Sequence, residues 1–502
     1  MKKILIPVLF VLTVLNIFFA AYPLFKGDVH FFNDVARDFH LLRELHEKKI
    51  ILIGPRSNAS GLFHGPLWTY VNFPVFIFSN GNPVAVAWNW ILLEIIALII
   101  GYLGVKKLFG ALPGWVFAYL YSYSFINHIN GMFHSDTPVY LTPLLYLSAV
   151  FYAKDKKFQV LLLHLTVAIM IMQLNVGVGI PVLILSVSMS LFLILKNRNW
   201  KHLAVFSVIP LFLLNFIIFD FRHDFLLSRS AYEFYNFQKN WTPLPLSFLL
   251  RNRLESTVHL QFYYSESFYL ALFIFTITIL SSIREILLKK LKAEYWLILY
   301  FYAGYMILSF TNKGVILSHF IYLNVGLTTI WFASFFRKKY INLFLPVLFI
   351  LGFLNINHAT GYLKELDTSY IGQNFQSWLS MKTAADTIIK KQKGEEFGYY
   401  VFAPDAFAYG PRYALIHLFE KTKTQAYEYQ KKNVTYLVAE PPPKNDPLMN
   451  HIWWRKNPVK ITSDPVWTEK FNNGYVIEEY HLTTAEQQIP HDKSIELGIH
   501  FR

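Results

Sequence analysis

The sequence predicts a polytopic α-helical membrane protein that ends in a small α/β extracytoplasmic domain. Its 502 residues are 54% hydrophobic and 18% aromatic, and its mean hydropathy of +0.34 is high for a soluble chain of this length. The apolar residues also form blocks of about 20 residues, the length that an α-helix needs to cross a bilayer. The strands of a membrane barrel would be shorter and would alternate apolar and polar residues.

About eleven hydrophobic blocks are candidates for membrane spans. They lie near residues 4–25, 83–104, 112–129, 137–153, 158–174, 178–195, 203–220, 267–283, 295–312, 315–335 and 341–357. The first block follows the basic start "MKK", and no small-residue cleavage site stands out after it, so we interpret it as a retained signal anchor. The transmembrane domain is therefore expected to cover residues 1–357.

The Lys and Arg residues predict the topology. Every second connection between blocks is short and basic, and such connections favour the cytoplasmic side. We therefore expect a protein of the cytoplasmic membrane with its N-terminus in the cytoplasm. The same loops account for much of the net charge of +14, so no nucleic-acid partner is expected. The basic connections contain Lys106–Lys107, Lys154–Lys157, Lys196–Lys201, Arg284–Lys292 and Arg337–Lys339.

The opposite side receives two long loops and the tail. Residues 358–502 are predicted to form the α/β domain, because "YYVFAP" and "VTYLVAE" are typical of buried strands and "RYALIHLFEK" of a helix. In the first loop, residues 26–82, the pattern "VARDFHLLRELHEK" predicts a helix lying in the membrane interface. Residues 221–266 are expected to form a second surface-lying platform. The chain has no Cys, which excludes disulfides and thiolate chemistry.

Ionisable side chains gather in these extracytoplasmic segments. Such groups are costly near a membrane, so their clusters suggest function. They offer carboxylates for a base or a metal and cations for a phosphate. The residues are Asp34, Arg37 and Asp38 in "NDVARD", His64 in "FHGP", His134 and Asp136 in "HSDTP", and Asp220, Arg222, His223 and Asp224 in "FDFRHDF".

The order of these elements over roughly residues 1–360 resembles the membrane glycosyltransferases of the GT-C fold. The long first loop with its early "DVARD" and its closing "GPLW", and the later "RHDF", are similar to family 39, which includes protein mannosyltransferase-like enzymes and lipid A aminoarabinose transferases. The resemblance implies a glycosyltransferase that moves a hexosyl or pentosyl group. The donor would be a polyprenyl-phosphate carrier, and the acceptor a lipid, glycan or protein on the extracytoplasmic face.

The resemblance also implies roles for individual residues. Asp34 matches the first-loop base that takes the proton of the acceptor hydroxyl. Arg222 and His223 are candidates for stabilising the departing lipid phosphate. Asp136 resembles a second-loop acidic residue that orients the acceptor or helps to hold a metal. The predicted substrate-binding set is completed by Arg37, Asp38 and His64.

The chain departs from the family pattern in two places. Val35 stands where many relatives have a second acidic residue. His64-Gly65-Pro66 stands where aminoarabinose transferases carry Lys-Pro-Pro, so a lysine contact to phosphate is missing and His64 is its candidate replacement. This second departure puts in doubt whether the transferred sugar is aminoarabinose.

Each candidate residue also has a structural interpretation. Asp34 and Asp136 are both suited to cap a helix. Arg222 is suited to anchor the chain to lipid headgroups, and Asp38 to pair with Arg37 or Arg43. His64 is as well suited to packing in its loop as to a functional contact, whereas Gln173 and His319 suit packing better than lining a cavity.

Two other classes of function remain open. A transporter or flippase of lipid-linked saccharides would share the membrane setting, although transporters more often show repeated halves and broken helices. A polymerase or ligase of surface polysaccharide would share the chemistry. The sequence identifies no cofactor with certainty, but Asp34, Asp136 and a His would suit a divalent cation, so metal dependence stays open.

The alternation of basic loops makes a direct prediction about topology. Reporter fusions at Lys156 and at residue 400 should report opposite sides of the membrane, with Lys156 cytoplasmic. The measurement is paired reporter activity in intact cells. Two cytoplasmic signals would contradict the odd number of spans.

Overall fold

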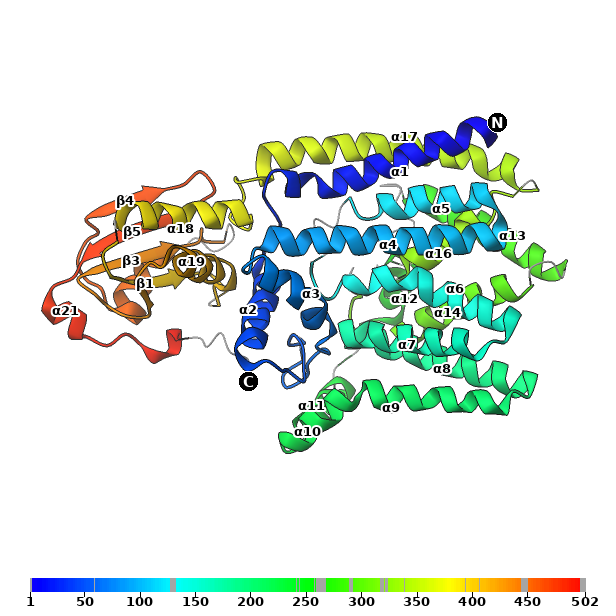
Figure 1. Ribbon diagram of the computed structural model, residues 1–502, viewed down its shortest axis with the longest axis horizontal. Helices are drawn as coiled ribbons and strands as arrows, with labels where there is room; N and C mark the ends of the chain where they lie inside the picture. Colours follow the sequence, from blue (N-terminus) through cyan, green and yellow to red (C-terminus); the bar gives the residue numbers. More distant parts are fainter. Residues whose placement is uncertain are drawn as a thin grey trace. The chain divides into compact units, whose positions relative to one another are not determined.

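The computed structural model describes residues 2–496 apart from 58, 127–131, 241, 243, 257, 259–267, 289–291, 317–319, 321–323, 338, 393, 406 and 444–449. The chain divides into two compact units. The membrane unit comprises Met1–Ala21, Ile50–Val71 and Asn89–Gly361, and the C-terminal unit comprises Tyr22–Lys49, Asn72–Trp88 and Tyr362–Arg502. Four helices contribute residues to both units: α1 (Lys2–Phe25), α3 (Leu67–Phe78), α4 (Pro83–Phe109) and α17 (Ile341–Glu365) (Figure 1).

The membrane unit is mainly helical in its described residues, apart from the loop before α3, where Arg56 and Phe63 form an isolated β-bridge. Each of the predicted hydrophobic blocks contains at least one helix. Besides the four helices above, it contains α5 (Ala111–Tyr123), η1 (Thr137–Leu141), α6 (Thr142–Asp155), α7 (Phe158–Leu174), α8 (Val176–Asn197), η2 (Trp200–Ser207), α9 (Val208–Phe212), α10 (Leu214–Arg222), α11 (Leu226–Asn240), α12 (Leu246–Glu255), α13 (Phe268–Leu287), α14 (Lys292–Ser309) and α16 (Val325–Ala333).

Six helical segments in the described part of the chain are long and apolar enough to cross a membrane. They are Ile4–Phe25, Pro83–Phe109, Val176–Asn197, Trp200–Arg222, Phe268–Leu287 and Ile341–Tyr370. The predicted class, a multi-pass helical membrane protein, is confirmed. The predicted number of eleven spans stays a prediction, because several helices in the blocks are shorter.

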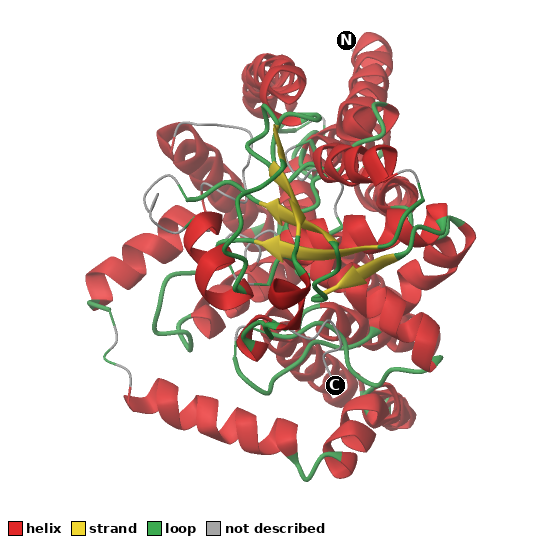
Figure 2. Cartoon of the chain, turned by 90° about the vertical axis from the view of Figure 1, so that its left-hand side faces the viewer, coloured by secondary structure: helices red, strands yellow, loops and turns green. Residues whose placement is uncertain are grey.

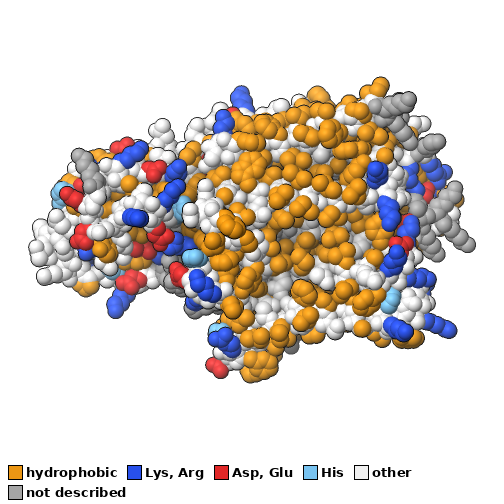
Figure 3. Space-filling model, in the orientation of Figure 1, with side chains coloured by type: hydrophobic (Ala, Val, Ile, Leu, Met, Phe, Trp, Pro, Cys, Tyr) orange, Lys and Arg blue, Asp and Glu red, His pale blue; other side chains and the backbone are white. Residues whose placement is uncertain are grey.

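The surface of the helices matches a membrane environment. Hydrophobic side chains cover a broad band of the helical region, and Lys and Arg gather at the end where the N-terminus lies (Figure 3). Two buried acidic residues of the unit form ion pairs with basic residues: Glu294 Oε1 lies 2.7 Å from Nζ of Lys154, in the last turn of α6, and Glu285 Oε1 lies 2.9 Å from Lys339 Nζ. The pairs offset the cost of burying these carboxylates.

The C-terminal unit is built on one five-stranded sheet in the order β2-β1-β3-β5-β4 (Figure 2). Strand β1 (Phe397–Phe402) pairs in parallel with β2 (Ala426–Glu428) and β3 (Val434–Ala439), whereas β5 (Val476–His481) runs antiparallel to β3 and to β4 (Trp467–Lys470). The two predicted strands and the predicted helix, α19 (Tyr409–Thr422), are present. The remaining elements are α18 (Trp378–Gln392), η4 (Leu366–Tyr370), α20 (His451–Trp454), η5 (Arg455–Val459), α21 (Thr484–Gln488) and η6 (Lys493–Ile495).

Helix α2 (Asn33–Lys48) is present where a helix lying in the membrane interface was predicted, but protein covers its apolar face. Val35, Phe39 and Leu42, the residues of that face, are fully buried, and α2 packs against α19 within the C-terminal unit. Arg43 extends the contact with two hydrogen bonds to the Glu420 carboxylate, at 2.7 and 2.5 Å. An amphipathic pattern marks a face that must be covered but does not identify what covers it.

One acid in the C-terminal unit predicts a pH-dependent stability. Glu440 directly follows β3, and burial, aided by the charge of Asp405, raises its pKa from 4.5 to about 8. A raised folded-state pKa stabilises the fold at low pH, and this contribution is lost as the pH rises through about 8.

We therefore expect the melting temperature of the whole protein to fall between about pH 5 and about pH 9, and to fall less in Glu440→Gln. Thermal unfolding of the purified protein measures both. Glu469→Gln, an exposed acid on β4, is the matched control and should keep the wild-type slope. The same slope in Glu440→Gln would show that this carboxyl is not the titrating group.

Candidate active site

Two carboxylates and a guanidinium are grouped at the start of α2. Arg37 Nη1 lies 3.0 Å from Asp34 Oδ1, and Arg37 Nη2 lies 3.6 Å from Asp38 Oδ1. The two acids differ in accessibility, because the side chain of Asp34 is 48% exposed and that of Asp38 is fully buried. Arg37 therefore bridges the two acids: it is anchored by the buried carboxylate of Asp38 and orients the accessible carboxylate of Asp34. The expected local pairing of Asp38 with Arg37 is present, whereas Arg43 pairs with Glu420 instead.

The capping interpretation of Asp34 is not observed. The N-cap position of α2 is Phe32, and no side chain caps the helix. Asn33 uses its Oδ1 to accept a hydrogen bond of 3.0 Å from the backbone N–H of Tyr409, within the C-terminal unit. The Asp34 carboxylate is thus bound by its ion pair with Arg37 and not by the helix terminus.

A second polar group lies in the membrane unit, where α7 meets α8, and we call it the α7–α8 cluster: His64, His134, Ser135, Gln173, Asn175 and Asn215. His64 Nδ1 accepts a hydrogen bond of 3.1 Å from the backbone N–H of Val176, and the ring of His64 lies 4.8 Å from that of His134. His134 Nε2 is in turn 3.1 Å from Ser135 Oγ. The two histidines that the sequence placed in separate loops are therefore neighbours.

The amides of the α7–α8 cluster join five segments of the membrane unit, one of which is the loop that contains Ser135. Asn175 caps α8 by accepting from the N–H of Gly177 at 3.0 Å, and its Nδ2 donates to Ser135 O at 3.3 Å. Gln173 Nε2 donates to Asn215 Oδ1 at 2.9 Å, and Asn215 Nδ2 donates to Leu52 O at 2.9 Å. These bonds tie the first loop to α7, α8 and α10.

Close packing in this cluster explains why a glycine, Gly65, stands in "FHGP". The segment folds back on residues 54–55, with the N–H of His64 donating to Pro55 O at 2.8 Å. Gly65 then lies so close to Gln173 that any added Cβ would overlap its side-chain oxygen. The departure from Lys-Pro-Pro therefore goes together with a tight contact between the first loop and α7.

The other predicted residues of the membrane unit lie at helix ends. Asp136 is half-buried at the N-cap position of η1, but its side chain makes no capping hydrogen bond. Arg222 and His223, at the end of α10, are exposed. His223 Nδ1 lies 2.8 Å from Phe219 O, and its ring stacks on that of Phe219 at 3.9 Å. Phe219 also contacts Phe63, the residue before His64.

Some members of this site were missed by sequence reasoning. Ser135, Asn175 and Asn215 carried only the weak signal of an amide or hydroxyl at the end of an apolar block.

Asp220 has a structural role, since its Oδ1 accepts from the N–H of Leu227 at 2.7 Å and so caps α11. His319 lies outside the described residues. Among the residues that the structure describes, no three His, Asp or Glu side chains are grouped closely enough to hold a metal ion.

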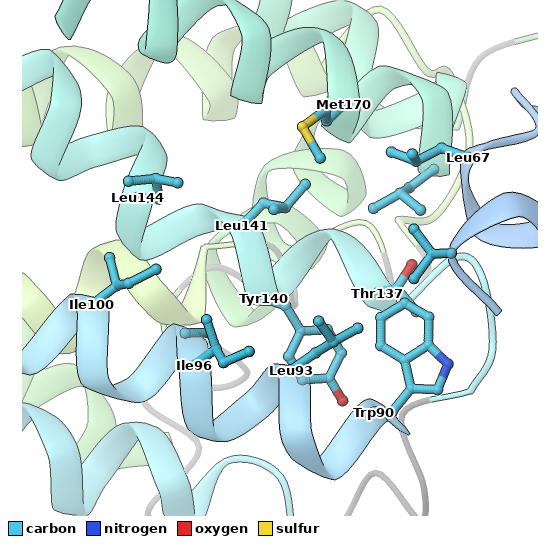
Figure 4. A pocket seen from close by; sticks show the side chains of 13 residues that line it. Leu67, Trp90, Leu93, Ile96, Ile100, Thr137, Tyr140, Leu141, Leu144 and Met170 are labelled. Carbon is cyan, nitrogen blue, oxygen red and sulfur yellow. The ribbon is translucent and has the colours of Figure 1, made fainter. Parts of the chain in front are cut away.

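An apolar cavity of about 140 Å³ lies within the membrane unit (Figure 4). Helices α4, α6 and α7, with η1 and the start of α3, supply its walls. Such a lining suits a hydrocarbon chain and offers little to a sugar. The lining residues are Leu67, Val71, Trp90, Leu93, Ile96, Ala97, Ile100, Thr137, Tyr140, Leu141, Leu144, Met170 and Leu174.

The fold is that of a multi-pass helical membrane protein, and it resembles the GT-C fold. ArnT from Cupriavidus metallidurans has the same fold. Its crystal structure bound to undecaprenyl phosphate aligns with a TM-score of 0.54 and 11% identity, over 95% of this chain and 98% of that one. Its apo state aligns with a TM-score of 0.53 and 11% identity, over 93% and 97%. No protein-family model matches the chain, and no curated protein matches it in sequence.

These comparisons confirm the resemblance to the GT-C class at the level of the fold. At 11% identity they do not carry the activity of ArnT to this chain. The roles predicted for individual residues stay predictions, and they are argued below from the chemistry of each side chain.

The hydrogen bond from Val176 predicts a structural role for His64. His64→Ala should leave the part-buried N–H of Val176 without this acceptor, at a cost of up to about 1–3 kcal/mol, whereas His64→Asn offers an amide oxygen near the same place. Thermal unfolding of the purified variants measures the difference. His46→Ala, at an exposed histidine, is the matched control. Equal stability of His64→Ala and His64→Asn would contradict this role.

Proposed function

We propose that this protein is a glycosyltransferase of the cytoplasmic membrane that moves a sugar from a polyprenyl-phosphate carrier to an acceptor on the extracytoplasmic face. Two findings support the proposal. The fold matches that of ArnT over nearly the whole of both chains, and ArnT was crystallised with undecaprenyl phosphate. The membrane unit also contains a cavity suited to a hydrocarbon chain, which a lipid-linked donor requires.

The observation that carries the proposal is the difference between Asp34 and Asp38. A general base must come within hydrogen-bond reach of the hydroxyl that it deprotonates. Asp34 is accessible and oriented by Arg37, whereas Asp38 is fully buried and so is closed to an acceptor. Asp34 is therefore the carboxylate of α2 that we assign as the base.

The reaction assigned to this base is a displacement at the sugar carbon C1. The acceptor hydroxyl oxygen forms the new bond to C1 while its proton passes to the Asp34 carboxylate. The bond between C1 and the phosphate oxygen breaks, and the polyprenyl phosphate leaves with the electron pair. A single displacement of this kind inverts the configuration at C1.

The leaving phosphate needs cationic donors. We assign this role to Arg222 and His223, which are exposed at the end of α10, because charge-assisted hydrogen bonds are stronger than neutral ones. The planar guanidinium of Arg222 can also bind two phosphate oxygens at once. Arg37 is assigned to orient Asp34, and Asp136 to orient the acceptor. The phosphate contact predicted for His64 remains a weaker assignment, because His64 Nδ1 already accepts from Val176.

The assignment of the base predicts a large loss of rate. Asp34→Asn removes the proton acceptor, and a positioned base contributes roughly 10²–10⁴-fold to the rate. The α2 helix should stay folded, since Asp34 does not cap it. The measurement is sugar transfer by purified protein from a polyprenyl-phosphate donor, normalised to the folded fraction.

Asp38→Asn is the matched control on the same helix. It weakens a buried ion pair, so it should lower the melting temperature more than the rate per folded molecule. Turnover close to wild type in Asp34→Asn would remove Asp34 from the reaction.

A further inference from the structure

Two side chains of α2 bind the backbone of one residue, Tyr409, and we call this arrangement the Tyr409 clamp. Asn33 Oδ1 accepts a hydrogen bond of 3.0 Å from the N–H of Tyr409. Seven residues further along α2, and so two turns away on the same face, His40 Nε2 lies 3.1 Å from Tyr409 O. A carbonyl oxygen only accepts, so this ring nitrogen donates. Both polar groups of one peptide residue are therefore bound by α2, and Asn33 directly precedes Asp34.

The segment that presents Tyr409 is itself held in place. Tyr409 is the first residue of α19, so its N–H has no acceptor inside that helix, and Asn33 supplies one. Ala408 has a φ of 52°, in the left-handed region that non-glycine residues seldom adopt. Asp405 Oδ1 supports this turn by accepting from the N–H groups of Phe407 and Ala408, at 3.0 and 3.1 Å. The clamp thus binds a fixed point of the C-terminal unit.

A second attachment lies before Asp34 in the chain. Asp28 is fully buried, and its carboxylate accepts from Ser377 Oγ at 2.6 Å and from the N–H of Leu379 at 3.0 Å, at the start of α18. His30 and Ser377 form an antiparallel β-bridge beside it. Asp34 therefore lies between two attachments to the C-terminal unit, one at Asp28 and one at the Tyr409 clamp.

The clamp takes the place of an ordinary helix cap. The first N–H groups of a helix have no partners inside the helix, so its first turn frays unless something holds it. No side chain caps α2. The bond from Tyr409 to Asn33 is thus a restraint on the turn that carries Asp34, and it leaves the Asp34 carboxylate free to pair with Arg37.

We propose that Asn33 is a positioning residue through which the C-terminal unit holds Asp34 in place for the reaction. This inference rests on the proposed role of Asp34 as the base. A base must come within about 2.6–3.2 Å of the hydroxyl that it deprotonates, and a displacement of about 1 Å can lower a rate roughly 100-fold. The C-terminal unit thereby contributes to the rate without supplying a reacting group.

The first test removes the acceptor of the Tyr409 N–H. In Asn33→Ala we expect the rate at saturating donor to fall about 10–100-fold. The donor KM should change less than about two-fold, since the change affects the base and not the binding of the carrier. Asn473→Ala is the matched control and should keep the wild-type rate, because Asn473 Oδ1 likewise accepts a backbone N–H at 3.0 Å, from Tyr475, in the turn between β4 and β5.

The assay uses purified full-length protein, and rates are normalised to the folded fraction. The donor is the radiolabelled lipid-linked sugar fraction extracted from cells without the gene, and the acceptor is membranes of the same cells. Asp34→Asn is measured beside the other variants, so that a failure of the base and a failure of the clamp give different results.

A second variant, Asn33→Asp, keeps an oxygen that accepts from Tyr409. We expect it to recover most of the wild-type rate at high pH. The added carboxylate beside Asp34 favours the protonated form of the base, so the acid limb of the pH–rate profile should move to higher pH. A residue that served stability alone would not move this limb.

A wild-type rate in Asn33→Ala, together with a large loss in Asp34→Asn, would overturn the positioning role and leave the base in place. Asn33→Asp as slow as Asn33→Ala at every pH would overturn it as well. A wild-type rate in Asp34→Asn would remove the base, and this proposal with it, whereas no transfer by the wild-type protein would contradict the proposed function itself.

Discussion

The hydrocarbon interior of a bilayer, which offers no hydrogen bonds, is the constraint on which the rest of this structure depends. It favours helices for the backbone of the membrane unit, and it favours hydrogen-bond partners for the polar side chains inside the unit. Asn16 of α1 illustrates this, because its buried Nδ2 donates to Tyr119 O and to Ser122 Oγ of α5, both at 3.1 Å. Two residues that we propose for the reaction, Asp136 and Arg222, both lie at helix ends.

The same constraint gives the α7–α8 cluster its form. Helix termini carry backbone groups without partners inside the helix. Here two side chains act as the partners, because His64 and Asn175 accept hydrogen bonds from the first N–H groups of α8. A residue placed at such an end can hold the fold and face the substrate region at once. For this reason His64 carries both a measurable structural role and a proposed functional one.

Much of this arrangement could be predicted from the sequence, because it follows from local pattern. The apolar blocks predicted the helices of the membrane unit, and two short apolar runs predicted strands β1 and β3. The partner of an amphipathic face was not predictable in the same way. Val35, Phe39 and Leu42 on α2 are covered by protein, which the pattern of apolar residues does not show by itself.

The candidate site shows the same limit. The charges around "NDVARD" are visible in the sequence, but the accessibility that separates Asp34 from Asp38 arises from tertiary packing. The pairing of His64 with His134 likewise joins residues that are far apart in the chain. Asn175 and Asn215 were overlooked because a single amide at the end of a span has no motif. Their structural role is visible only in the folded protein, where the backbone groups that they bind lie beside them.

The central claim is that a sugar leaves a lipid carrier and becomes part of a second molecule. Mass spectrometry of membrane glycolipids and glycoproteins, from cells with and without the gene, tests it most directly. The account predicts that one glycosylated acceptor loses a single sugar in cells without the gene, while the polyprenyl-phosphate sugar accumulates. Unchanged acceptors together with an unchanged pool of lipid-linked sugar would contradict it.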